Sequence, residues 1–144
     1  MKLKKILFAI TIISIWIICI GGCESDRNGD PIEIVVKNNA NDTVRFVLQN
    51  NYPDTVLINS REYPHLAEGT AVHPYSKSRF WAFSGWEWTL GNERKVDGLV
   101  CIVYSLDTLR KYPFEQIQED YNILKRYILS IEDLKSINWT IEYP

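Results

Sequence analysis

Hydrophobic and polar residues alternate in short runs along most of the chain after residue 31. Runs rich in β-branched and aromatic residues occupy positions 32–37, 43–49, 55–59, 80–83, 86–90 and 99–104, and turn-forming residues separate several of them. Spacings near ten residues are typical of antiparallel strands. The pattern therefore predicts a mainly β fold whose strands pack as a sandwich or an open barrel.

The last third of the chain adds helical spacing to this pattern. Asp107 is expected to cap a short helical turn, and Ser130 is the expected N-cap of a later helix, with a carboxylate three residues on. Helices are expected over 108–111, from Pro113 onward and over 131–137, and strands over 123–129 and 139–143. The predicted fold class is mainly β and antiparallel, with short C-terminal helices; an α+β fold is the alternative.

Two segments of the chain resemble each other. Residues 38–44 and 50–56 share the pattern Asn-Asn-x-x-Asp-Thr-Val. Asn and Asp side chains bond to nearby backbone groups and tolerate left-handed conformations. We therefore expect two equivalent turns, because two copies are too few for a repeat architecture.

The N-terminal segment is typical of an export signal. Lys2, Lys4 and Lys5 precede the uncharged apolar run 6–20. About 15 residues of helix rise only about 22 Å, which is short of the roughly 30 Å hydrocarbon core of a bilayer. Residues 1–22 are therefore predicted to be a cleaved signal peptide, and an uncleaved anchor helix is the alternative.

The end of this run resembles the lipobox of bacterial lipoproteins, in which an aliphatic residue and two small residues precede a cysteine that is acylated. Here that sequence is Ile20-Gly21-Gly22-Cys23. The resemblance implies lipid on Cys23. The polar composition and the turn formers before residue 32 predict a flexible tether over 23–31, and the remaining length predicts a single β-rich domain over 32–144. Asp26, Asn28 and Asp30 superficially echo a calcium loop, but the glycine and the closing glutamate of that motif are missing.

Charge and cysteine content narrow the possible partners. The whole chain has a formal charge of −2, and loss of the three lysines in residues 1–22 leaves −5. An acidic protein is a poor candidate for nucleic-acid binding, which requires a basic face. Cys101 would be the remaining thiol, in an apolar run that predicts a buried strand. The competing hypothesis makes Cys101 a nucleophile served by His65 or His73.

The segments 103–109 and 123–143, with the ending Asn-Trp-Thr-Ile-Glu-Tyr-Pro, resemble the C-terminal part of small lipoproteins common in gut Bacteroidota. The resemblance implies a lipid-anchored envelope location, expected at the outer membrane on either its periplasmic or its surface face, and it carries no activity. Thr43, Thr55 and Thr108 each follow Asp and precede an aliphatic residue, which matches the O-glycosylation motif of that phylum. Ordinary turn and cap chemistry is the alternative.

Five aromatic residues fall within positions 80–88. One interpretation sends Trp86 and Trp88 into the core of a small sandwich. In the other, Trp81, Trp86 and Trp88 form a platform for stacking sugars, with Glu87 binding hydroxyl groups.

No known catalytic triad or metal motif occurs in the sequence. We therefore expect a non-catalytic envelope interaction module without metal or cofactor, held at the membrane by lipid on Cys23. Its partner would be a protein, or a glycan if the aromatic platform forms.

Overall fold

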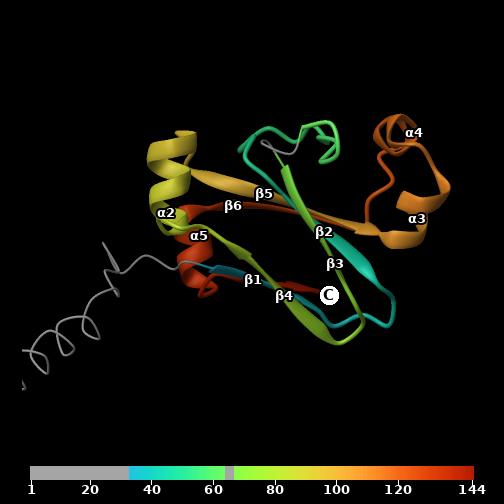
Figure 1. Ribbon diagram of the computed structural model, residues 1–144, viewed down its shortest axis with the longest axis horizontal. Coiled ribbons are helices and arrows are strands. Elements are labelled where there is room, and N and C mark those ends of the chain that lie inside the picture. Colours follow the sequence, from blue (N-terminus) through green and yellow to red (C-terminus); the bar gives the residue numbers. More distant parts are fainter. Residues whose placement is uncertain (1–32, 64–66) are drawn as a thin grey trace, which may run out of the picture.

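The computed structural model describes residues 33–63 and 67–144. These residues form two sheets joined by short helices (Figure 1). The strands are β1 (Glu33–Asn38), β2 (Val44–Gln49), β3 (Ala67–Val72), β4 (Ser76–Trp81), β5 (Gly98–Ser105), β6 (Lys125–Ser130) and β7 (Thr140–Tyr143). The helices are α2 (Trp86–Trp88), the π-helix η1 (Thr89–Arg94), α3 (Leu106–Lys111), α4 (Phe114–Glu119) and α5 (Ile131–Ser136). The predicted mainly β, sandwich-like class is confirmed.

The strands divide into a three-stranded sheet A, with the order β4-β1-β7, and a four-stranded sheet B, with the order β3-β2-β5-β6. All neighbouring pairs are antiparallel except β1 and β7, which run parallel. The predicted antiparallel arrangement therefore holds for every pair but one. Helices α2 and α5 lie at one end of the molecule, and α3 and α4 lie at the other (Figure 1).

The core between the sheets follows from alternation along each strand. In β1, Ile34 and Val36 are fully buried, whereas Glu33, Val35 and Lys37 are partly exposed on the opposite face. Sheet B supplies the other half of this core from β2, β3 and β5, and Trp86, Leu90, Leu134 and Trp139 close the end that carries α2 and α5. Burial of these apolar side chains is the main favourable contribution to folding.

Sheet B is covered on both faces. The even-numbered outer residues Val100, Ile102 and Tyr104 of β5 form a second cluster with Leu57 and with Ile117 of α4. Strand β5 is accordingly buried along seven of its eight residues. This two-sided burial explains why its sequence is a continuous apolar run instead of an alternating one.

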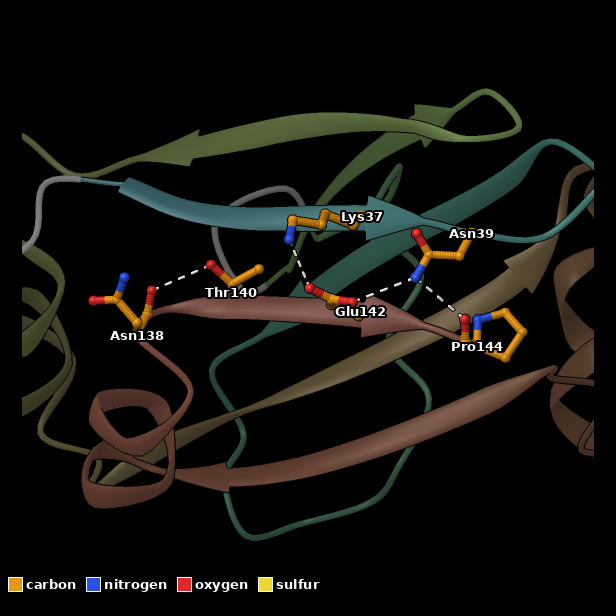
Figure 2. Close-up of polar contacts among 6 residues, drawn as sticks. All are labelled: Lys37, Asn39, Asn138, Thr140, Glu142 and Pro144. Carbon is orange, nitrogen blue, oxygen red and sulfur yellow. Dashed lines mark hydrogen bonds and ion pairs between the residues drawn. The ribbon is translucent and has the colours of Figure 1, made fainter.

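The outer face of sheet A is polar, and its last strand is fixed by charge (Figure 2). Lys37 Nζ lies 2.6 Å from Glu142 Oε1 across the parallel pair of β1 and β7. Asn39 Nδ2 donates to Glu142 Oε2 at 3.4 Å and to the Pro144 carbonyl at 3.3 Å. The hydrogen bonds from Lys37 and Asn39, together with the charge of Lys37, hold the pKa of Glu142 below its usual range.

Acid is expected to weaken two of these local structures. In the capping box of α5, the hydroxyl and the backbone N–H of Ser130 both donate hydrogen bonds to the Asp133 carboxylate, and these bonds lower the pKa of Asp133. Lys37 and Asn39 lower the pKa of Glu142 in the same way. A carboxyl with a lowered pKa in the folded state stabilises the fold above its ordinary pKa, and this contribution disappears as the pH falls through the folded value. Urea unfolding midpoints should therefore decrease between about pH 6 and about pH 3.

The variants Glu142→Gln and Asp133→Asn should lose less stability over this pH range than the wild type loses. The control is Glu119→Gln at the exposed end of α4. An equal acid response in Glu142→Gln and in the wild type would contradict this assignment for Glu142.

Several predicted elements were wrong. Residues 86–90 form helical turns, not a strand, because the buried Trp86, Thr89 and Leu90 recur at spacings of three and four. Residues 55–59 form no strand; Leu57 instead covers the outer face of sheet B. Helix α3 is capped by the Ser105 hydroxyl, which accepts from Thr108 N, and not by Asp107.

The two turns with the shared pattern do form side-chain bonds to the backbone. Asn38 Oδ1 accepts from Ala40 N at 3.0 Å, and Asp54 Oδ1 accepts from Val56 N at 3.1 Å. Neither segment contains a residue with positive φ, so these turns do not use the left-handed conformation that Asn and Asp tolerate. Only the first turn leads directly into a strand, which is β2.

Candidate functional site

A pocket of about 230 Å³ lies on the face of sheet B that is turned away from sheet A. Its floor consists of Arg45 and Val47 from β2 and Tyr104 from β5. One wall is formed by residues 58–61, and the other by α3, α4 and the residues that join them. The pocket therefore belongs to the end of the molecule that carries α3 and α4 (Figure 1).

The strand register places a charged residue in this otherwise apolar layer. Arg45 alternates with Phe46 in β2, so it shares the outer face with Val47, and it lies directly opposite Tyr104 of β5. On its other side, β3 has Gly69 opposite Val47. A Cβ atom at Gly69 would lie 2.9 Å from Arg45 Nε and 3.2 Å from Arg45 Nη2. The guanidinium thus lies over the glycine, where any larger residue would displace it.

Two polar groups on the floor of the pocket have no partner in the described part of the protein. Arg45 Nε and Tyr104 Oη are both buried and without a hydrogen bond. Tyr104 is 1% exposed. Burial, with a smaller contribution from Tyr121, raises the pKa of Tyr104, so its hydroxyl stays protonated and can donate. Buried polar groups are nearly always hydrogen-bonded. Among the described residues, side-chain oxygens of Gln49, Asn50 and Asn51 are also buried without a partner.

Within the described residues, 33–63 and 67–144, Arg45 takes part in no ion pair. The other arginine at the pocket is Arg61, and the one carboxylate that lines it is Glu115. The pocket therefore holds two cationic groups and one anionic group, with apolar and aromatic surface around them.

This pocket could not be predicted from the sequence. Its polar residues come from separate strands, and only the register brings Arg45, Gly69 and Tyr104 together. The available indication was Arg45 itself, which interrupts an apolar strand on the same face as Val47.

The predicted aromatic platform is divided between the core and the surface. Trp86 is 2% exposed, and its Nε1–H donates to the Phe80 carbonyl at 3.1 Å, so this ring is a core residue. Trp81 is 60% exposed and lies on the outer face of sheet A, and Trp88 is 36% exposed. Glu87 accepts a hydrogen bond from Lys135 Nζ at 2.8 Å. Any ligand of this region would therefore contact Trp81 and Trp88 but not Trp86.

The three threonines of the O-glycosylation pattern are partly exposed. Thr43 precedes β2, and its hydroxyl lies 3.4 Å from His73 Nδ1. Thr55 is in the loop after β2, and Thr108 is in α3. Their modification stays a prediction.

Cys101 lies in the core between the sheets and is fully buried. Burial raises the pKa of the Cys101 thiol, which keeps it neutral and unreactive in the folded state. The prediction of a buried strand is confirmed. Within residues 33–63 and 67–144, no group of three or more His, Cys, Asp or Glu residues is arranged to hold a metal ion.

Several residues of interest lie outside the described ranges. They are Cys23, His65 and the acidic residues Asp26 and Asp30, together with Asn28. In the part of the chain that the structure describes, no helix is both long and apolar enough to cross a bilayer.

No protein-family model, curated protein or solved structure matches this chain.

Proposed function

We propose that the protein is an exported lipoprotein of the cell envelope, anchored at the outer membrane by lipid on Cys23, and that its folded part is a non-catalytic binding module. The observation that carries this proposal is Ile20-Gly21-Gly22-Cys23 at the end of an uncharged apolar run preceded by lysines. Acylation contributes about 0.8 kcal/mol of membrane affinity per buried CH₂, and two or more chains anchor a protein stably.

The folded part of the chain begins soon after Cys23, so the proposed lipid would lie close to the fold. Nine residues separate Cys23 from Glu33, the first residue of β1, and nine residues span at most about 30 Å when fully extended. Strand β1 begins at the end of the molecule that carries α2 and α5 (Figure 1). The pocket is associated with the other end, so an anchored molecule would present it away from the membrane.

The buried, neutral thiol of Cys101 argues against the hypothesis that this cysteine is a nucleophile. A cysteine nucleophile must be accessible and able to form a thiolate, and Cys101 is neither.

The test of the anchor is metabolic labelling with an alkyne fatty acid in a bacterial host that processes lipoproteins. The wild-type chain should incorporate the label and lose residues 1–22, whereas Cys23→Ser should incorporate none and Cys101→Ser should label normally. Intact mass analysis of the same product would also detect glycan on Thr43, Thr55 or Thr108. A product that retains residues 1–22, or that lacks lipid on Cys23, would contradict the anchor.

A second candidate function is glycan binding, which the exposure of Trp81 and Trp88 favours. Exposed tryptophan rings stack on the apolar faces of sugars. Under this hypothesis, Trp81→Ala would keep the fold and lose retention on a polysaccharide affinity gel. Retention equal to that of the wild type would exclude Trp81 from such a site.

A further inference from the structure

We propose that Trp81 and Phe83, which we call the aromatic turn, insert into the headgroup region of the bilayer that holds the anchor. The molecule would then rest on the membrane by the end that carries α2 and α5. This inference rests on the proposed lipid on Cys23 and adds a second contact with the same membrane.

The two rings of the aromatic turn project into solvent from neighbouring positions. Trp81 is 60% exposed and Phe83 is fully exposed, whereas Ala82 between them is buried. In an extended backbone, side chains two residues apart point to the same side, which here is the side away from the core. Gly85 N donates to the Ala82 carbonyl at 3.1 Å and closes a tight turn that has Phe83 near its tip.

The strand register places the aromatic turn beside the start of the folded chain. Glu33, the first residue of β1, is paired directly with Trp81, and the Cα atoms of such pairs lie about 5 Å apart. Strand β4 leads from there into α2 (Figure 1). The nine residues between Cys23 and Glu33 span at most about 30 Å, so lipid on Cys23 would hold Trp81 close to the bilayer.

This tether makes a weak contact effective. A short link between two binding groups raises the effective concentration of the second group to the order of mM. Tryptophan favours the membrane–water interface, where its amphipathic ring lies at headgroup level, and phenylalanine adds apolar area. The lipid would therefore supply the affinity for the membrane, and the aromatic turn would fix the orientation of the fold on it.

The carboxylates next to the aromatic turn are paired with cations. Glu33, opposite Trp81 in the register, lies 3.1 Å from Arg79. Glu87, the acidic residue nearest to Phe83 in sequence, lies 2.8 Å from Lys135. Neither carboxylate would face the lipid headgroups unpaired. We therefore expect an apolar contact that high salt does not weaken.

The experiment uses the acylated, processed chain in phosphatidylcholine vesicles whose fatty chains carry bromine near the headgroup. Bromine quenches the fluorescence of tryptophan rings that enter the bilayer. Processing removes residues 1–22 with the tryptophan that they contain, and Trp86 and Trp139 are buried in the core. The quenching therefore reports the exposed rings of Trp81 and Trp88.

We expect brominated vesicles to quench the emission of the wild type relative to vesicles without bromine, equally in low and in high salt. Trp81→Ala should lose most of this quenching, because the ring that enters the bilayer is absent. Phe83→Ser keeps both exposed tryptophans and should also weaken the quenching, because the neighbouring apolar ring no longer holds Trp81 in the interface.

The matched control is Tyr75→Asn, which removes an exposed ring from the other end of β4. Tyr75 has a φ of 52°, and asparagine tolerates this left-handed backbone. This variant should be quenched as the wild type is. Circular dichroism verifies that each variant is folded.

Flotation of the vesicles separates failure of this proposal from failure of the anchor. Wild-type protein that floats with the vesicles but is not quenched would overturn the membrane contact and leave the anchor intact. The same holds if quenching is unchanged in Trp81→Ala and in Phe83→Ser. A processed chain without lipid on Cys23 would overturn both proposals together.

Glycan binding by Trp81 is the competing outcome, since a ring buried among headgroups cannot stack on a sugar. Retention on a polysaccharide gel that Trp81→Ala abolishes, together with unquenched emission in brominated vesicles, would assign the aromatic turn to glycan binding and overturn the membrane contact.

Discussion

Replacing Trp86 by alanine is expected to lower the free energy of unfolding by about 3–5 kcal/mol. Trp86 is the largest of the fully buried side chains, and it closes the end of the core between the two sheets. The substitution would remove the ring from this core together with its hydrogen bond to the Phe80 carbonyl. Because small folds are stable by only about 5–15 kcal/mol, this loss is a large fraction of the total stability. Urea denaturation followed by circular dichroism measures the change.

The same aromatic segment provides the control for this prediction. Trp81 is exposed on the outer face of sheet A, so Trp81→Ala should change the free energy of unfolding by no more than about 0.5 kcal/mol. If both variants were equally stable, the assignment of Trp86 to the core would be wrong.

Gly98→Ala is expected to destabilise the fold by about 3 kcal/mol or more, since a small-to-large change would meet backbone that cannot move away. A Cβ atom at Gly98 would lie 2.2 Å from the Leu129 carbonyl oxygen and 2.9 Å from Ser130 Cα. Gly98 is where β5 begins, directly opposite Ser130 at the end of β6. The methyl group would therefore separate two paired strands of sheet B.

Gly91→Ala is the matched control for Gly98→Ala. Its Cβ would have no atom within 4 Å, and Gly91 lies within the π-helix η1. Alanine should stabilise a helical position by about 0.5–1 kcal/mol relative to glycine. Thermal unfolding of the two variants side by side should give shifts of opposite sign; a similar loss in both would show that close packing at Gly98 is not the cause.

Strand positions could be predicted where burial is one-sided and the alternation is clean. Strand β1 is such a case, because Ile34 and Val36 point inward and charged residues flank them. Strand β5 was predicted for another reason, its continuous apolar run. The structure shows that this strand is covered on both faces, with Leu57 and Ile117 on the outer one.

The prediction failed where structure depends on distant partners. The sequence of β3, which includes Glu68, Gly69 and Thr70, has little apolar character, and it becomes an edge strand only because β2 pairs with it. At 86–90 the apolar residues are compatible with either a strand or a helix. Gly85, with φ of 80°, turns the backbone between β4 and α2 and thereby separates the environments of Trp81 and Trp86.

The candidate site shows the same limit. The continuous apolar run of β5 correctly placed Cys101 in the interior, so its lack of reactivity could be anticipated. The pocket could not be predicted, because Arg45, Gly69 and Tyr104 are far apart in sequence and lie on three strands that come together only through pairing.

The parallel pair of β1 and β7 has a mechanical consequence. Glu33 and Tyr143 lie at opposite ends of the two paired strands, with Val35 opposite Thr140 and Asn38 opposite Tyr143. A tensile force applied between these ends acts along the strands, so the hydrogen bonds that join them, such as Val35 N to the Trp139 carbonyl and Asn39 N to the Tyr143 carbonyl, are strained in shear all at once. Rupture then requires their simultaneous failure instead of stepwise opening, which gives this pair of strands high resistance to a force applied between Glu33 and Tyr143.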